Sequence, residues 1–272
     1  MDIESLATEH RIVGRRDELR SMLACIGAAR NVLLEGPVGV GKTALARAVA
    51  AGVGRDWIRV DGDGRYTEGK LVGHFDPPGV IEHGYQPEHF VPGPLVRAMQ
   101  SGAVLFINEL NRMPEGVQNV LLPAMDEGCV HVPHLGTIQA VDGFVVIATQ
   151  NPAEFVATGH LSEALLDRFE LVRLRHQGAE EERMIVRQDA RCSPSDALVD
   201  AAVTLARATR EDPRIRRGAS VRAATAIADL ATQLDGDVDA AAQLALPTRI
   251  ELIDGEDGNL DSVLADLKKK SR

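Results

Sequence analysis

A glycine-rich loop at residues 36–43 is the feature that most constrains the fold of this chain. It reads Gly-Pro-Val-Gly-Val-Gly-Lys-Thr, follows the apolar run 32–34 and precedes the helix-forming run 44–50. A strand that leads into such a loop and then into a helix directs backbone N–H groups and a helix N-terminus at one point, where they bind a polyphosphate. The pattern therefore predicts a nucleotide site in an α/β domain.

The residue types in this loop match the chemistry of a magnesium nucleotide. Its glycines allow backbone conformations and a close approach that a Cβ would block. We expect Lys42 to reach the β- and γ-phosphates and the Thr43 hydroxyl to ligate Mg²⁺. The predicted nucleotide-binding residues of this segment are Gly36, Pro37, Val38, Gly39, Val40, Gly41, Lys42, Thr43 and Ala44.

Composition narrows the class of protein. A chain of 272 residues with 44% hydrophobic residues is long enough for one nucleotide-binding domain and a smaller unit. A net charge of −10 and only 3% aromatic residues disfavour non-specific binding of nucleic acid. Residues 1–10 lack a basic and then apolar leader, and the longest apolar runs are too short to span a bilayer. With three scattered cysteines and no CxxC, we expect a soluble, cytoplasmic protein.

Alternating patterns predict a parallel sheet covered by helices on both faces, a three-layer αβα fold. The expected strands are 32–34, 57–61, 103–109, 144–151 and 170–175, and the expected helices are 17–29, 94–100, 115–126 and a short one that starts near Ser162. Two segments interrupt the alternation: a long Gly/Pro/His-rich loop at 62–93 and a hairpin at 129–141.

From residue 178 onward the pattern predicts helices only, at 180–190, from near Ser193 or Ser195 to 209, and at 220–234. Residues 247–259 are ambiguous between strand and loop, and a last helix follows. We therefore expect a nucleotide-binding domain at 1–176 and a small helical domain at 177–272.

The order of the motifs resembles that of an AAA+ ATPase of the P-loop NTPase fold, and more narrowly that of the MoxR family. The resemblance spans about residues 10–225 and rests on the loop, on Phe-Ile-Asn-Glu-Leu-Asn-Arg at 106–112, on Ala-Thr-Gln-Asn-Pro at 148–152, on Leu-Leu-Asp-Arg-Phe at 165–169 and on Gly-Ala-Ser-Val-Arg-Ala at 218–223. It implies that the nucleotide is ATP and that the C-terminal helices form a lid.

The resemblance also implies roles for single residues. Glu109 matches the Walker-B glutamate, which orients and activates the attacking water, and Asn151 matches sensor 1. Arg168 matches the arginine finger, which acts on the neighbouring subunit's γ-phosphate, and Arg222 matches sensor 2 of its own subunit. The implied catalytic set is Lys42, Glu109, Asn151 and Arg168, and Arg222 joins the nucleotide-binding residues.

Each of these roles has an ordinary structural alternative. Asn151 could simply begin an Asn-Pro turn, and Arg168 could be a solvated surface residue. Arg222 is one of five arginines between 210 and 222, most of which we expect on a solvated helical face. Arg112 is a weaker candidate for an interface contact, or an ordinary residue at the start of a helix.

One position departs from the family pattern. Asn108 stands where the Walker-B motif usually has an aspartate, so the site lacks a carboxylate that would hold the hydration shell of Mg²⁺. The amide oxygen of Asn108 can still contact Mg²⁺ through a water, but it brings no negative charge. We therefore expect an active but slow ATPase.

Histidines raise the alternative of a transition-metal site. Cys129, His131 and His134 fall in the hairpin, and three more histidines fall in 62–93. A regular hairpin places Cys129 and His131 on one face and His134 elsewhere, so ordinary loop histidines are the favoured interpretation.

The family resemblance implies a chaperone-like machine that uses ATP to mature or activate a client enzyme complex. Such rings, commonly hexamers, act with a protein that contains a von Willebrand factor A (VWA) domain, and some members help to insert a metal centre. The segments 62–93 and 129–141 are the expected effectors. Two alternatives stay open: an assembly scaffold that binds ATP and hardly hydrolyses it, and a DNA-directed motor, which the acidic residues of 62–93 disfavour.

Overall fold

The computed structural model describes residues 2–151, 161–253 and 260–270. It divides into two compact units, one made of residues 1–37 and 41–174 and the other of 38–40 and 175–272. Within the described ranges, none of the helices combines the length and the apolar character that crossing a bilayer requires. Each unit is described below by itself.

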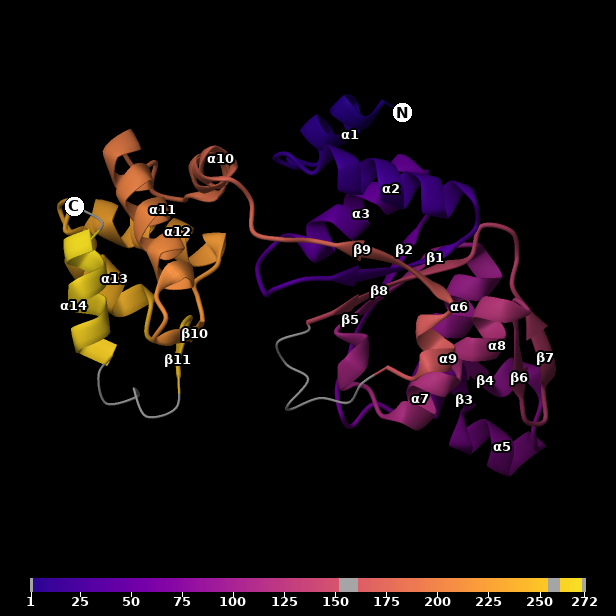
Figure 1. The fold of residues 1–272 in the computed structure, drawn as a ribbon. Coiled ribbons are helices and arrows are strands. Elements are labelled where there is room, and N and C mark those ends of the chain that lie inside the picture. Colours follow the sequence, from indigo (N-terminus) through magenta and orange to yellow (C-terminus); the bar gives the residue numbers. More distant parts are fainter. Residues whose placement is uncertain (1, 152–160, 254–259, 271–272) are drawn as a thin grey trace. The chain divides into compact units, whose positions relative to one another are not determined.

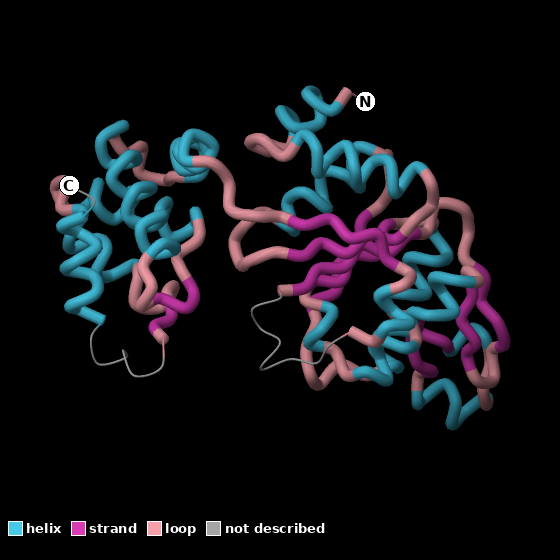
Figure 2. Tube along the Cα trace, viewed as in Figure 1, coloured by secondary structure: helices cyan, strands magenta, loops and turns pink. Residues whose placement is uncertain are grey.

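The first unit is built on a five-stranded parallel sheet (Figures 1 and 2). Its strands are β1 (Asn31–Glu35), β2 (Trp57–Asp61), β5 (Val104–Asn108), β8 (Val145–Gln150) and β9 (Phe169–Arg173). They lie in the order β2-β5-β8-β1-β9, so the loop after β1 leaves from the interior of the sheet. The predicted parallel α/β sheet is confirmed, and the carboxyl ends of all five strands meet at one edge.

Helices cover both faces of this sheet (Figure 1). The unit contains α1 (Ile3–Glu9), α2 (Arg16–Gly27), α3 (Lys42–Gly52), α6 (Pro94–Ser101), α7 (Glu115–Asn119), α8 (Leu121–Asp126) and α9 (Glu163–Leu166). Leu105 and Ile107 pack in one core cluster with Leu95 and Met99 of α6. Phe106, which points to the other face because side chains alternate along a strand, is also fully buried. Both faces of the sheet are therefore buried, as the continuous apolar strands predict.

The segment 62–93 is not the irregular loop that its composition predicts. It contains α4 (Glu68–Val72), β3 (Gly73–Phe75), α5 (Pro77–His83), the 3₁₀ turn η1 (Pro87–His89) and β4 (Phe90–Pro92). Strands β3 and β4 pair antiparallel, and Leu71 is fully buried in the main core. Thr67 and Asp76 cap the two short helices, so side-chain caps and one buried leucine order a sequence that is poor in apolar residues.

Of two smaller predictions in this unit, one needs correction and one is confirmed. The helix predicted over 115–126 is interrupted at Val120, between α7 and α8. Pro123 explains the break, because it lacks the N–H that would bond to the carbonyl four residues earlier. The predicted hairpin is confirmed as β6 (Cys129–Val132) and β7 (Gly136–Gln139), and the 3₁₀ turn η2 (Leu110–Arg112) follows β5.

The second unit contains helices α10 (Ala179–Asp189), α11 (Asp196–Glu211), α12 (Val221–Gln233), α13 (Val238–Ala245) and α14 (Leu260–Lys270). The prediction of helices only is wrong in one respect, since β10 (Ile215–Arg217) pairs antiparallel with β11 (Glu251–Leu252). The ambiguous segment 247–259 thus supplies a short strand, while residues 254–259 lie outside the described ones. The unit has its own apolar core, in which Ala223, Ile227 and Val203 are fully buried.

Candidate functional site

The loop between β1 and α3 has the backbone shape of a phosphate cradle. Gly39 and Gly41 have φ angles of +81° and +93°, which other residues rarely adopt, and Gly41 is the N-cap of α3. Lys42 folds back so that its Nζ donates to the carbonyl oxygens of Gly36 at 2.6 Å and Pro37 at 2.9 Å. Its ammonium therefore lies over the loop, where a phosphate would meet it.

Asn108 and Glu109 follow at the carboxyl end of β5. Glu109 has φ +57° and ψ +52°, a left-handed conformation that costs a non-glycine residue free energy. Its backbone N–H donates to Oγ1 of Thr149 at 2.8 Å, and Thr149 is fully buried at the end of β8. The hydroxyl of Thr149 in turn donates to Oδ1 of Asn108 at 3.1 Å. A neighbouring strand thus fixes the backbone that carries the predicted catalytic carboxylate.

Two residues that sequence reasoning did not single out complete this edge. Asp61, the last residue of β2, pairs with Asn108 and accepts a hydrogen bond from its Nδ2 at 3.0 Å. Arg59 binds the same carboxylate at 2.6 Å. The hydrogen bonds from Arg59, and to a smaller extent that from Asn108, lower the pKa of Asp61. The signal available in the sequence was a carboxylate at the end of the expected strand 57–61.

The carboxylate of Glu109 is bound by Arg112, whose Nε lies 3.1 Å from Oε2. Both side chains are partly exposed, at 29% for Glu109 and 42% for Arg112, so the ion pair is accessible to solvent and weak. Arg112 therefore has a partner inside its own chain, in addition to the interface contact suggested by the sequence. In this structure the carboxylate of Glu109 is therefore held by the turn that follows β5.

Asn151 is buried directly after β8, with 3% of its surface exposed. The preceding Gln150 donates to Oε2 of Glu35 at 2.8 Å, and Arg173 binds the other oxygen of Glu35 at 3.0 Å. Polar side chains therefore connect β8, β1 and β9 at the edge where the loop begins. Asn151 lies at this edge, as the sensor-1 prediction requires, while Pro152 of the same motif is outside the described residues.

Arg168 lies between α9 and β9, and it is bound within its own chain. Its Nε donates to Oδ2 of Asp126 at 2.6 Å, and its Nη1 donates to the carbonyl oxygen of Ala164. Ser162 caps α9 by accepting from the N–H of Leu165, which confirms the predicted start of this helix. The Arg168 side chain is 28% exposed, so part of it faces solvent at the surface of the first unit.

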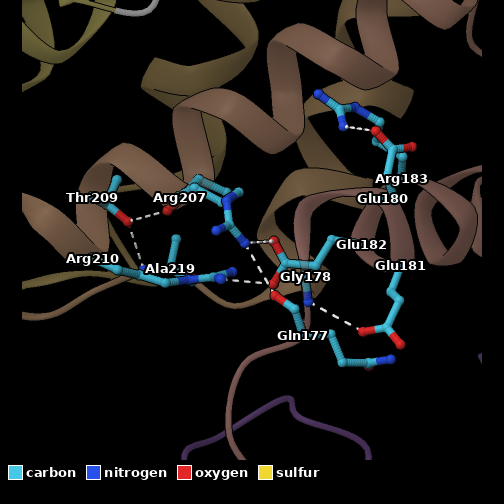
Figure 3. A network of polar contacts seen from close by, with 11 residues as sticks. Gln177, Gly178, Glu180, Glu181, Glu182, Arg183, Arg207, Thr209, Arg210 and Ala219 are labelled. Atoms are coloured by element: carbon cyan, nitrogen blue, oxygen red, sulfur yellow. Dashed lines mark hydrogen bonds and ion pairs between the residues drawn. The ribbon is translucent and has the colours of Figure 1, made fainter. Parts of the chain in front are cut away.

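Arg222 lies in the first turn of α12 in the second unit, and a buried ion-pair network holds the segment before it (Figure 3). Glu182 of α10 is 2% exposed and binds Arg210 at 2.6 Å and Arg207 at 3.5 Å. Arg210 also donates to the carbonyl of Ala219, whose N–H is bound by the hydroxyl of Thr209.

The prediction of a solvated helical face for these arginines holds only in part, because Arg216 and Arg217 are exposed but lie on a strand. Arg210 is buried against Glu182 and only 13% exposed, Arg214 binds Asp212 and Asp266, and Arg216 and Arg217 bind Glu251 from a strand. Helix α11 ends at Glu211, just before Pro213, and the segment then continues through β10. Acidic residues of α10, β11 and α14 bind its arginines.

The residues at the sheet edge suit a magnesium nucleotide. Mg²⁺ prefers oxygen ligands, and the donors in this part of the chain are the Thr43 hydroxyl, the Asn108 carbonyl and the carboxylates of Asp61 and Glu109. Lys42 and the N-terminus of α3 supply the positive charge that phosphates require. The donor set therefore fits ATP with Mg²⁺.

The histidines do not gather into a metal site within the described part of the chain, where no group of three His, Cys, Asp or Glu residues could hold a metal ion. As predicted for a regular hairpin, Cys129 and His131 share one face of β6. His134 sits in the turn and stacks on Tyr85, with ring centroids 3.9 Å apart. That contact joins the hairpin to the segment 62–93.

Comparison with known proteins places these observations in a family. A sequence profile described as AAA domain (dynein-related subfamily) matches residues 31–169. The gas vesicle ATPase GvpN2 of Halobacterium salinarum is 32% identical over 86% of this chain and 71% of its own length. Protein MoxR of Methylorubrum extorquens is 35% identical over 58% of this chain. YeaC of Bacillus subtilis, an uncharacterized protein, is 38% identical over 60% of it.

The chain spans about half the length of two of these relatives, 48% of YeaC and 44% of MoxR. Among solved structures, a mutant of RuvB from Thermotoga maritima superposes with a TM-score of 0.55 at 20% identity, over 86% of this chain and 71% of RuvB. This likeness concerns the fold alone.

Proposed function

The chain belongs to the MoxR family of AAA+ ATPases, and on this premise we propose that it binds ATP with Mg²⁺ at residues 36–44 and hydrolyses it in a homo-oligomeric ring. The observation that carries the proposal is the backbone of Glu109, held in its left-handed conformation by buried Thr149 at the same sheet edge as the phosphate loop. A strained, supported carboxylate at a nucleotide site is typical of a catalytic position.

The roles of the residues follow from phosphoryl-transfer chemistry, which needs positioning and charge neutralisation more than covalent steps. When bound, Mg²⁺ would supply positive charge that offsets the negative charge of the phosphates. Lys42 and the N-terminus of α3 bind the phosphates, and Thr43 would hold the metal. Glu109 leaves Arg112 and orients the attacking water, with the amide of Asn151 beside it at the end of β8.

Arg168 and Arg222 would complete the site from other parts of a ring. Arg168 belongs on the surface of the first unit and is held by Asp126 until a neighbouring subunit presents its γ-phosphate. Arg222, whose segment is braced by Glu182 and Arg210, would contact the phosphates of its own subunit. The proposal assigns 1–176 as the nucleotide-binding domain and 177–272 as the lid of each subunit, with six subunits as the family resemblance implies.

The experiment that tests this proposal is steady-state ATPase activity with Mg²⁺ at several protein concentrations, read beside the oligomeric mass with and without ATP. We expect the activity per subunit to rise as the ring forms, because Arg168 then reaches a neighbouring site. Activity that is independent of assembly would contradict a shared site, and the absence of ATP binding would contradict the proposal as a whole.

A second candidate function rests on Asn108. Because the Walker-B position has no charge, the protein could act as an assembly scaffold that binds ATP and hardly hydrolyses it. In that case ATP would drive assembly while phosphate release stays at background. The same measurement therefore separates the two candidates.

We propose that the ring acts on a protein assembly through the segments 62–93 and 129–141. The stacking of Tyr85 on His134 joins the two segments, and Ile81 of α5, within 62–93, is 84% exposed. The relative named a gas vesicle ATPase supports a multi-subunit client, and the family resemblance supports a VWA-domain adaptor and, in some members, metal-centre insertion. Ile81→Asp is expected to leave basal hydrolysis unchanged and to abolish its stimulation by a VWA-domain partner.

A further inference from the structure

Three polar side chains form a hydrogen-bonded row where β2, β5 and β8 end. The register pairs Asp61 of β2 with Asn108 of β5. On the other side, Ile107 of β5 pairs with Ala148 of β8, so Asn108 lies level with Thr149 one residue further on. Asn108 donates from Nδ2 to Asp61 at 3.0 Å and accepts at Oδ1 from Thr149 at 3.1 Å. Asn108 is thus bound on both sides.

The direction of these hydrogen bonds assigns the amide of Asn108. Thr149 Oγ1 accepts the N–H of Glu109, so its own hydrogen is available for the oxygen of Asn108. An ionised Asp61 can only accept, so the nitrogen of Asn108 faces Asp61. The amide would have to lose both bonds in order to flip.

The backbone holds Asp61 in this place. The N–H of Gly62 donates to the carbonyl oxygen of Asn108 at 2.7 Å. A Cβ at residue 62 would lie only 2.1 Å from the carbonyl oxygen of Glu109, so a glycine is required for this approach. The end of β2 therefore packs directly on the peptide that joins Asn108 and Glu109.

An aspartate at position 108 would face Asp61 across the present 3.0 Å contact. Two carboxylates at such a distance do not both ionise readily, because like charges disfavour each other. Asparagine avoids this conflict and turns the contact into a hydrogen bond. The absence of a charge at 108 and the presence of one at 61 are therefore physically linked.

We infer that Asp61 and Asn108 together replace the single Walker-B aspartate. Asp61, which also binds Arg59, supplies a carboxylate beside the Mg²⁺ hydration shell. It also orients the Asn108 amide, so that the carbonyl oxygen, which accepts from Thr149, keeps its second lone pair for a water of that shell. Asp61 is then a positioning residue of the nucleotide site. The inference rests on the proposed function, because it concerns the metal that accompanies ATP.

The test is a charge exchange between the two positions, with Asp61→Asn, Asn108→Asp and the double variant. The readout is the Mg²⁺ concentration that half-saturates binding of a fluorescent, non-hydrolysable ATP analogue, beside its affinity in EDTA. Asp61→Asn is expected to raise that concentration about fivefold, a modest effect because Asp61 is 60% exposed, and to leave the EDTA affinity unchanged.

Asn108→Asp alone is expected to need at least as much Mg²⁺ for half-saturation as the wild type, since it places two carboxylates side by side. In the double variant the side chain at position 61 is the donor and the one at position 108 the acceptor, so the hydrogen bond between the two positions is restored in the opposite direction. We expect its half-saturating Mg²⁺ concentration to lie within about twofold of the wild-type value, because the two substitutions compensate each other. Asp63→Asn is the matched control, because Asp63 is a nearby exposed carboxylate that binds Arg65. It should leave the Mg²⁺ dependence unchanged.

Three outcomes would overturn the inference. These are an unchanged Mg²⁺ dependence in Asp61→Asn, a tighter Mg²⁺ dependence in Asn108→Asp alone, and an equal loss of affinity with and without Mg²⁺, which would show a structural role only. If circular dichroism shows that Asp61→Asn does not fold, the Mg²⁺ dependence of Asn108→Asp decides, together with that of the double variant where the second substitution restores folding. A wild type that binds no nucleotide would contradict the proposed function itself, whereas a wild type that binds normally with an unresponsive Asp61 contradicts only this inference.

Discussion

At the scale of single residues, Glu109 combines a costly backbone conformation with a supporting hydrogen bond. A non-glycine residue in the left-handed region costs about 1–3 kcal/mol, and it persists only where its surroundings impose it. Here the support comes from buried Thr149, and Arg112 binds the side chain from the following turn. The end of β8 therefore holds the backbone of Glu109, and the turn after β5 holds its carboxylate.

We predict that Glu109→Gln preserves ATP binding and lowers turnover about a hundredfold or more, since the amide cannot accept the proton of the attacking water. Phosphate release and binding of a fluorescent ATP analogue measure the two effects. Glu115→Gln is the matched control, because Glu115 is an exposed residue in the first turn of α7. Retained turnover in Glu109→Gln would remove Glu109 from the catalytic role.

Thr149→Val should lower kcat with little change in KM, because the N–H of Glu109 loses its acceptor and the carboxylate is no longer held in position. A buried donor without a partner costs about 1–3 kcal/mol, so stability to urea should fall as well. Thr149→Ser keeps the hydroxyl and should retain kcat. If serine and valine lower kcat equally, the hydroxyl does not position Glu109.

At the scale of elements, periodicity and motif order were sufficient for the sheet and for most helices. The strands β1, β2, β5, β8 and β9 lie where apolar runs between turn signals predict them. The segment 62–93 was missed as structure because its order depends on two caps and on Leu71, which the chain's own periodicity does not mark.

Residues of the candidate site that belong to a sequence motif could be predicted. Residues whose role depends on a contact with another strand could not. Lys42, Glu109 and Asn151 follow from their motifs and lie at one sheet edge. The contacts of Asp61 and Thr149 depend on which strands are neighbours and in which register, and a single sequence does not contain that information. The same reason explains why the arginines after residue 209 were misread.

The network around Glu182 gives a prediction at this scale (Figure 3). Glu182→Ala leaves Arg210 without its buried partner and should destabilise the second unit by about 3–5 kcal/mol. Glu180→Ala is the control, because Glu180 is 83% exposed and its ion pair with Arg183 should contribute less than about 1 kcal/mol.

Two spectroscopic probes separate the units in this experiment. Trp57, the one tryptophan of the chain, stacks on Phe106 in the first unit, so its fluorescence reports that unit alone. Far-ultraviolet circular dichroism reports the helices of both units. We expect Glu182→Ala to shift the dichroism transition in urea and not the fluorescence transition. A shift of the fluorescence transition alone would contradict the assigned role.

At the scale of the whole molecule, the proposed ring requires Arg168 to exchange one partner for another. In the single chain its guanidinium is bound by Asp126, and this hydrogen bond also raises its pKa, so the group stays charged at all relevant pH values. A neighbouring γ-phosphate carries more negative charge than one carboxylate and would compete for it. Assembly would thus be coupled to the presence of ATP.

We predict that Arg168→Ala and Lys42→Ala are each inactive alone and that mixing them restores part of the activity, because a hybrid ring contains sites with an intact loop and an intact neighbouring arginine. ATP hydrolysis across mixing ratios measures this, with mixed assembly confirmed by native mass. Arg30→Ala is the control, since Arg30 is exposed and binds Glu170 in its own chain. If confirmed hybrid rings stay inactive at every ratio, Arg168 does not act on a neighbouring subunit, and its bond to Asp126 is structural.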